Sequence, residues 1–246
     1  MIIFFKSRIL ELFKKIINLI NKQKSNYIEN EIIRTCKNYK FNRTSEHTLW
    51  DTFNLTKNVL SKKVQGDLVE CGVETGHSLV LFQKIIQKLN LENIKIYGYD
   101  TFEGMPLPGD YDENKYGVSL IKKYEDKKIN ANTSGWSNVS INNVKLNFYS
   151  NTKPNSNLQL IKGKVEQTLL INENLSEKIS LLKIDTCLYE STKIILEILS
   201  PRVQKNGIII IDNYFNYKGI KKATDEYCAK KGYLIRHFPI FGGENR

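Results

Sequence analysis

The sequence predicts an α/β fold: a doubly wound, mainly parallel sheet covered by helices on both faces and preceded by a helical N-terminal extension. Short apolar runs alternate with segments of helical periodicity along most of the chain, which is the pattern of parallel strands joined by crossover helices. The 246 residues are enough to bury a full core. Acidic residues end several of the apolar runs, so the same edge of the sheet is expected to carry the chemistry.

The first segment predicts an amphipathic helix. Apolar residues recur there every three or four positions, at Ile2, Phe5, Ile9, Phe13, Ile16 and Ile20. Lysine and arginine residues interrupt this segment, so neither a membrane span nor an ordinary signal peptide is expected. Two alternatives stay open for residues 1–22: packing on the body or on a second subunit, and lying on an anionic membrane surface. We therefore expect a cytoplasmic homo-oligomer, with peripheral contact at the inner face of the membrane as the alternative.

Residues 23–50 are polar and show no clear period, and a helix is expected over residues 49–64. The domain boundary is placed after this region. Residues 1–60 form the helical extension, as a cap or an oligomerisation element, and residues 61–246 form the main domain.

Within the main domain the strands and helices alternate. Strands are expected at 67–73, 94–100, 158–163, 180–185 and 207–212, with a sixth at 233–241. Helices are expected at 77–89, 190–199 and 217–231. A loop rich in Gly, Pro and Asp follows the second strand, and a polar helical region then continues to about residue 150.

Composition excludes some classes of function. The formal net charge is +11, but the lysines are scattered along the chain and no nucleic-acid-binding signature accompanies them, so no nucleic-acid partner is expected. The four cysteines, at positions 36, 71, 187 and 228, are far apart and lack the spacing of a zinc site. This spacing favours a reducing compartment.

The turn after the first strand indicates the kind of ligand. Gly72 and Gly76 bracket it, and their spacing departs from the G-x-G-x-x-G of dinucleotide enzymes, which argues against a pyrophosphate ligand and a nicotinamide oxidoreductase. Glu70 at the end of the first strand suits a cationic or amino-bearing group, and Asp100 at the end of the second suits ribose hydroxyls. Together these residues favour an adenosine ligand that carries an amino acid, such as S-adenosylmethionine.

Five stretches of the chain resemble a known motif series. They read ECGVETGHS, YDTFEGMP, KGKVEQTL, KIDTCLYEST and IIDNYFNYKGIKKATDEY, and they are similar to those of the macrocin O-methyltransferase (TylF-type) family over residues 60–235. The resemblance implies a Rossmann-like methyltransferase fold. It also implies a metal-assisted transfer of a methyl group from S-adenosylmethionine to a sugar or glycan hydroxyl, with Mg²⁺ as the metal.

The resemblance also implies a set of cofactor-binding residues. The methionine part of the cofactor would lie against Glu70, Gly72 and Ser78, and Asp100 would hold the ribose. Gly76, which closes the same turn, is also expected to be a cofactor-binding residue. Thr101 and Phe102 follow in the adenosine loop, although Phe102 could equally be plain core. The wall of the adenine pocket would comprise Gly163, Val165 and Glu166.

The resemblance places the metal on Asp185, Asp212 and Asn213, which agrees with the preference of a hard divalent cation for carboxylate and amide oxygens. The family commonly has Asp at position 213. Asp185 and Cys187 are the expected catalytic residues, and Cys187 is the larger departure, since the family usually has a second Asp there, proposed as the base. Either the metal activates the hydroxyl with little help and Cys187 assists or fills space, or efficient catalysis has been lost.

Further alternatives remain. His77 and His237 are other candidate bases, although a lone histidine is more often structural. The chain could also be a non-catalytic module that keeps the cofactor pocket. The acceptor pocket is expected to be lined by the loop 103–120 and by residues 23–50.

Overall fold

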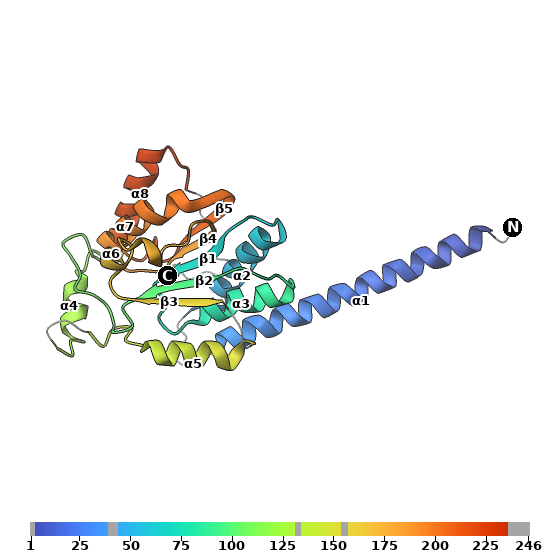
Figure 1. Cartoon of the computed structure of the whole chain (residues 1–246), viewed down its shortest axis with the longest axis horizontal. Coiled ribbons are helices and arrows are strands. Elements are labelled where there is room, and N and C mark those ends of the chain that lie inside the picture. Colours follow the sequence, from blue (N-terminus) through green and yellow to red (C-terminus); the bar gives the residue numbers. More distant parts are fainter. Residues whose placement is uncertain (1–2, 39–43, 131–133, 154–156, 236–246) are drawn as a thin grey trace.

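The computed structural model describes residues 3–38, 44–130, 134–153 and 157–235. At its centre is a parallel five-stranded sheet of order β3-β2-β1-β4-β5 (Figure 1). Its strands are β1 (Asp67–Cys71), β2 (Ile96–Asp100), β3 (Leu158–Lys162), β4 (Ile179–Ile184) and β5 (Val203–Ile211). The chain builds outward from β1 to β3 and then returns to place β4 and β5 on the other side of β1. The predicted doubly wound parallel sheet is therefore confirmed, with its switch point between β1 and β4.

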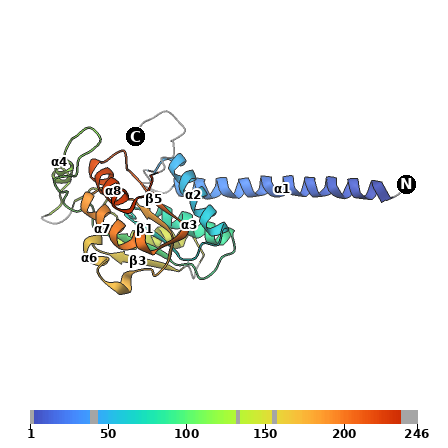
Figure 2. The same ribbon diagram turned by 90° about the horizontal axis from the view of Figure 1, so that it is seen from above.

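Helices cover both faces of this sheet (Figures 1 and 2). One face packs against α2 (Glu46–Ser61), α3 (His77–Lys88) and α5 (Ile141–Asn151), in an apolar cluster that includes Phe53, Phe82 and Phe148. The other face packs against α7 (Tyr189–Leu199) and α8 (Lys218–Lys231), in a second apolar cluster that includes Ile195 and Leu199. The short helices α4 (Leu120–Glu125) and α6 (Val165–Thr168) lie in the connections. Two buried clusters on opposite faces are what a parallel sheet requires.

The N-terminal helix α1 (Ile3–Lys37) projects away from this body (Figures 1 and 2). Residues 23–37, where the sequence showed no clear period, continue this helix. The pattern is weak because only its last turns touch the body, through the buried Ile32, Ile33 and Cys36. Glu29 connects this end of the helix to the body through two ion pairs. Its Oε1 lies 2.7 Å from Lys57 Nζ and 3.2 Å from Lys88 Nζ.

Several predicted boundaries shift. Helix α2 begins three residues earlier than expected because Ser45 caps it, with its Oγ accepting a hydrogen bond from the backbone N–H of Thr48 at 3.1 Å. Strand β5 begins at Val203 rather than at position 207. Tyr233 to Ile235 form no strand, and the rest of the predicted sixth strand lies outside the described residues. The side chains of most of the N-terminal apolar stripe also lie outside the described part of the structure.

Helix α2 contributes Leu49, Phe53 and Leu60 to the buried cluster of the main sheet. The domain boundary at residue 60 stays a prediction. Within the described ranges, no helix combines the length and the apolar character needed to cross a membrane.

Candidate active site

A large cavity opens at the carboxyl ends of the strands. Its volume is about 1390 Å³, and it extends from the switch point between β1 and β4 along the outer edge of β5. Ligands of open α/β sheets bind at this kind of position. Ligand pockets commonly measure about 300–1,000 Å³, so the cavity has room for a cofactor and an acceptor together.

The turn between β1 and α3 forms one wall of the cavity. Gly72 adopts a φ of 89°, and a Cβ atom there would lie 2.3 Å from the backbone oxygen of Asp185, so only glycine fits. Asp100 Oδ2 accepts hydrogen bonds from the backbone N–H groups of Val73 at 2.8 Å and Glu74 at 3.0 Å. Its Oδ1 accepts one from the N–H of Phe102 at 2.8 Å. The Asp100 carboxylate therefore fixes this turn and the loop after β2 relative to each other.

The structure brings most of the predicted cofactor-binding residues to this cavity. Six of them line it: Gly72, Asp100, Thr101, Gly163, Val165 and Glu166. The other four are buried behind its wall: Glu70, Gly76, Ser78 and Phe102.

A buried lysine that the sequence analysis did not single out lies at the centre of the acidic residues. Lys183 is 1 % exposed, and its Nζ contacts Asp185 Oδ2 and lies 3.0 Å from Glu70 Oε1 and 3.5 Å from Asp212 Oδ2. The sheet register explains the arrangement, because Glu70 and Lys183 are partners on β1 and β4. Asp185 and Asp212 directly follow β4 and β5, whose last residues are also partners.

Burial and mutual contact set the charges of this cluster. Burial alone would lower the pKa of Lys183, but Asp185, Glu70 and Asp212 outweigh it and raise that pKa well above the usual range. Burial raises the pKa of Glu70 to about 7 although Lys183 opposes the shift, and burial followed by the nearby Asp185 raises the pKa of Asp212. The ammonium group of Lys183 is thus held charged among three carboxyl groups.

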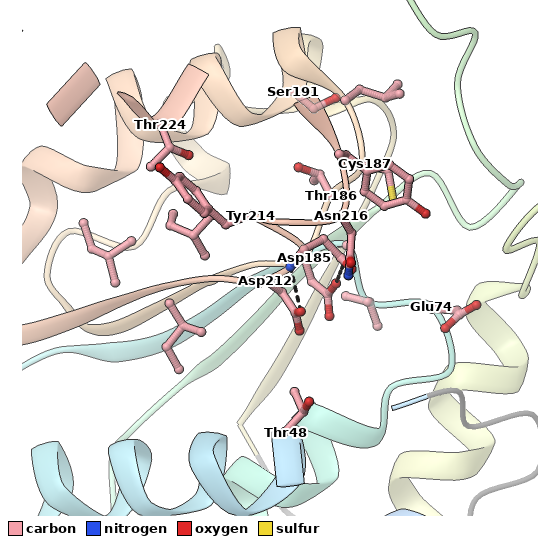
Figure 3. Close-up of a pocket in the computed structure, with 18 of the residues that line it drawn as sticks. Thr48, Glu74, Asp185, Thr186, Cys187, Ser191, Asp212, Tyr214, Asn216 and Thr224 are labelled. Carbon is pink, nitrogen blue, oxygen red and sulfur yellow. Dashed lines mark hydrogen bonds between the residues drawn. The ribbon is translucent and has the colours of Figure 1, made fainter. Parts of the chain in front are cut away.

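Two of the three predicted metal ligands converge. The side chains of Asp185 and Asp212 lie next to each other and face the cavity, with Thr48 of α2 on its other side (Figure 3). Asn213 instead turns its Nδ2 toward Asp185 Oδ1 at 3.0 Å, and its own Oδ1 accepts from Asn216 Nδ2 at 3.2 Å. In the part of the chain that the structure describes, no three His, Cys, Asp or Glu side chains gather as a metal site.

The donor set nevertheless fits a hard divalent cation. Two carboxylates side by side supply oxygen ligands, and rotating the Asn213 amide would present a third oxygen. The Asn213 amide donates to the Asp185 carboxylate at 3.0 Å, and a half-turn of that amide exchanges the places of its nitrogen and its oxygen.

Cys187 lies at the boundary between the cavity and an apolar cluster formed by Leu120, Trp136 and Leu188. Burial raises the pKa of its thiol to about 12, and the nearby Asp185 adds to the shift. A thiol in this environment is protonated at neutral pH, which weighs against the role of base and favours that of space filling.

Of the two histidines considered as bases, the structure describes only His77. His77 is buried, and burial lowers its pKa to about 3, so it is neutral. Its ring is held by Thr44 Oγ1 at 2.8 Å and Thr75 Oγ1 at 3.2 Å, which is a structural arrangement. His237 lies outside the described residues.

The residues that line the acceptor end of the cavity agree in part with those predicted from the sequence. Gly104 to Pro106 line it from the loop 103–120, and Lys37 and Thr44 to Thr48 line it from the segment 23–50. The sequence analysis missed Trp136 and Lys123, whose Nζ lies 3.7 Å from the Trp136 ring centroid. Both residues fall in the stretch that was expected to be a polar helical region, and its sequence pattern did not indicate which side chains face the cavity.

With this geometry established, comparison with known proteins decides the family. Residues 38–236 match the family model described as Macrocin-O-methyltransferase (TylF). The chain belongs to the TylF family. The predicted resemblance is thereby confirmed for most of the chain.

Two named relatives are similar over shorter stretches. The chain is 29 % identical to demethyldecarbamoylnovobiocin O-methyltransferase of Streptomyces niveus, over 71 % of this chain and 62 % of that protein. It is 28 % identical to 8-demethyl-8-(2,3-dimethoxy-alpha-L-rhamnosyl)-tetracenomycin-C 4'-O-methyltransferase of Streptomyces olivaceus, again over 71 % of this chain and 62 % of the relative. The chain therefore matches less than two thirds of the length of these relatives.

Solved structures agree on the fold. The O-methyltransferase NovP superimposes with a TM-score of 0.69 at 24 % identity, covering 85 % of this chain and 84 % of NovP. The calicheamicin methyltransferase CalS11 superimposes with a TM-score of 0.60 at 21 % identity, covering 91 % of this chain and 90 % of CalS11. The TylF-family chain thus has the Rossmann-like methyltransferase fold.

Proposed function

We propose that the protein transfers a methyl group from S-adenosylmethionine to a hydroxyl group of a sugar or glycan. The observation that carries the proposal is the placement of Asp185 and Asp212 at the floor of the cavity, beside the Gly72 turn, in a TylF-family chain. In this reaction the acceptor oxygen bonds to the methyl carbon as the sulfur–carbon bond breaks, and the hydroxyl proton is lost to a base or to water. Positioning of the two reactants supplies much of the acceleration.

The charges of the cavity support a cationic ligand. Three carboxyl groups surround the single ammonium of Lys183, so the cluster carries excess negative charge when its acids are ionised. A sulfonium and an amino group, both present in S-adenosylmethionine, would be attracted to that charge.

Hydrogen bonding supports the same ligand at the adenine end. Glu166 Oε1 accepts a hydrogen bond from Ser191 Oγ at 2.6 Å, whereas the buried Oε2 has no hydrogen-bond partner among the described residues. An unpaired buried acceptor is costly, and an amino group of a ligand such as adenine would satisfy it. We therefore propose that Glu166 Oε2 accepts a hydrogen bond from the amino group of the adenine.

We further propose that Mg²⁺ is held by Asp185, Asp212 and Asn213. When bound, such a cation would make a nearby hydroxyl more acidic and offset negative charge. Asp185 would in addition orient the acceptor hydroxyl, and Lys183 would keep the two aspartates together on the inner side of the cluster.

The sugar class of the acceptor rests on two kinds of support. The name of one relative describes methylation of a tetracenomycin that carries a rhamnosyl group, and CalS11 is described as a TDP-rhamnose 3'-O-methyltransferase. In this chain, Trp136 and Tyr217 line the cavity and belong to one apolar cluster beside it. Aromatic rings with polar neighbours offer the apolar faces and hydrogen bonds that sugars need.

Methyl transfer can be tested directly with the purified protein. Labelled S-adenosylmethionine is incubated with glycans extracted from a strain that lacks the gene, so that the acceptor hydroxyl is unmodified. Label should enter the glycan with Mg²⁺ present, fall at least about 100-fold in excess chelator, and return when Mg²⁺ is restored. Full transfer in chelator would remove the metal from the proposal.

The same experiment separates the enzyme from a non-catalytic module. Binding of S-adenosylhomocysteine without any transfer to any extracted glycan would favour the module. Asp67 provides a control, because its carboxylate lies at the opposite end of β1 and accepts hydrogen bonds from the Lys95 N–H at 3.0 Å and Ser176 Oγ at 2.8 Å. Asp67→Asn should keep the transfer that Asp185→Asn loses.

A further inference from the structure

Helix α1 carries most of its length outside the body of the protein (Figures 1 and 2). Its contacts with the body begin at Ser25, whose Oγ accepts a hydrogen bond from Lys88 Nζ at 3.1 Å, so residues 3–24 form a projecting segment about 33 Å long. Where the side chains of this segment are described, the apolar ones face solvent: Ile17 is 53 % exposed, Leu19 61 % and Ile20 56 %. Exposed apolar surface of this kind does not stabilise a monomer in water, and it commonly marks an interaction site.

Helical periodicity gathers most of the apolar residues of the projecting segment on one side. At about 100° per residue, all of them except Phe4 fall within about 200° of the helix circumference. These positions are Ile3, Phe5, Ile9, Leu10, Leu12, Phe13, Ile16, Ile17, Leu19 and Ile20. Lys6 and Lys24 also fall within this arc, and the remaining four basic residues fall on the opposite side.

The projecting segment is also strongly basic. It contains six basic residues against one acidic residue, Glu11. The basic positions are Lys6, Arg8, Lys14, Lys15, Lys22 and Lys24. A wide apolar face beside a lysine-rich polar face is the composition of helices that lie in the interface of an anionic bilayer.

We propose that residues 3–24 of α1 bind the surface of a membrane that contains anionic lipids. The apolar face enters the boundary between headgroups and acyl chains, and the lysines contact lipid phosphates. Lys37 at the other end of α1 lines the active-site cavity. Binding through α1 would therefore hold that cavity near the membrane.

The same features argue against a second copy as the occupant. A two-stranded coiled coil uses a narrow apolar seam flanked by complementary charges. The apolar face of this segment is about half the circumference, and a helix with six basic residues and one acidic residue cannot supply the opposite charges. Two such helices side by side would repel each other.

The test uses the full chain and vesicles of known composition. The protein is sedimented with vesicles of phosphatidylcholine alone or mixed with phosphatidylglycerol. We expect binding to the mixed vesicles, weak binding to phosphatidylcholine, and release by high salt. The double variant Ile17→Asp with Ile20→Asp should weaken binding more than about tenfold, because it places charge in the apolar face. Both residues are exposed, so the body should remain folded.

A matched control makes the same chemical change elsewhere. Leu170 and Ile171 are 69 % and 51 % exposed on the body, and the variant Leu170→Asp with Ile171→Asp alters the net charge equally. It should bind the mixed vesicles within about twofold of the unmodified protein. The proposal is overturned if the unmodified protein ignores the mixed vesicles or if both double variants bind alike. It is also overturned if the α1 variant instead halves the mass in light scattering without vesicle binding, which would identify a second copy as the occupant.

Discussion

Lys183 Nζ lies 3.0 Å from Glu70 Oε1, and each of these two side chains is only 1 % exposed. The pair joins β1 to β4 beneath the cavity and extends to Asp185 and Asp212 at its floor. A buried charge pair contributes little net stability, but loss of one partner leaves the other uncompensated. We therefore expect the positions of Glu70, Asp185 and Asp212 at the ends of these strands to depend on Lys183.

Replacing Lys183 by Met should destabilise the protein strongly. The ammonium is lost while Glu70, Asp185 and Asp212 remain, so we expect a loss of about 3–5 kcal/mol in the free energy of unfolding. Urea unfolding measures this loss. The double variant with Glu70→Gln should recover part of it, because one of the unpaired carboxyl groups is removed. A loss below about 1 kcal/mol for Lys183→Met would show that the cluster is not stabilised in this way.

Replacing Asp100 by Ala should weaken cofactor binding. The carboxylate orders the Gly72 turn through Val73 and Glu74, and we propose that it also holds the ribose. Calorimetry with S-adenosylhomocysteine should show a loss of about 1–3 kcal/mol in binding free energy. Asp67→Ala, which removes a hydrogen-bonding carboxylate from the other end of the sheet, is the control. Equal affinity for all three proteins would remove Asp100 from the cofactor site.

Replacing Cys187 separates its two possible roles. The thiol is protonated at neutral pH, so Cys187→Ala should reduce the transfer rate by less than about 100-fold, the lower limit for loss of a dedicated base. Cys187→Asp should preserve or raise the rate if its carboxyl group ionises beside the apolar cluster. Cofactor affinity is measured for both variants first, because a charge against Trp136 and Leu188 can disturb the fold. A loss above about 10⁴-fold in Cys187→Ala would make the thiol the essential base.

The sequence predicted the strand ends of this site well. Asp185 and Asp212 end apolar runs, and parallel strands carry their carboxyl ends to one edge, so the pattern supported the convergence that the family resemblance implied. Lys183 was missed because it sits inside an apolar run and was counted as part of the strand. The available signal was a pair of opposite charges, Glu70 and Lys183, inside two strands that were both expected to be buried. Charged residues in such strands are paired.

Other features depended on contacts that periodicity does not record. Helix α1 continues to Lys37 because a few residues, including Ile32 and Ile33, pack on the body and Glu29 forms ion pairs with α2 and α3. Asn213 turned its amide nitrogen rather than its oxygen toward Asp185, which depends on the local charge and on Asn216. Sequence identifies such residues but not the direction in which they point.

Acid should destabilise the fold through His77. Burial lowers the folded-state pKa of this histidine to about 3, below its ordinary value of 6.5. The unfolded chain therefore takes up a proton first, and stability that is complete above pH 6.5 is lost as the pH falls toward 3. Between pH 7.5 and pH 5 the contribution of His77 is a loss of about 2 kcal/mol. The raised pKa of Glu70 acts in the opposite direction over this range, so the contribution is read from the difference between the unmodified protein and a His77 variant.

Unfolding at these two pH values, for two histidine variants, measures this contribution. On going from pH 7.5 to pH 5, His77→Gln should end about 2 kcal/mol more favourably than the unmodified protein. His47→Gln should not, because His47 is exposed. If both variants lose as much stability as the unmodified protein, another group is responsible for the acid sensitivity.

Mass spectrometry of surface glycans tests the proposed function most directly. Glycans are compared from cells with the intact gene, cells without it, and gene-deleted cells that express either the unmodified protein or Asp185→Asn. The account predicts one glycan species that is heavier by one CH₂ unit with the intact gene, is lost on deletion, and returns with the unmodified protein but not with Asp185→Asn. Identical glycan masses in all four samples, or full restoration by Asp185→Asn, would contradict the assignment of glycan O-methylation to this site.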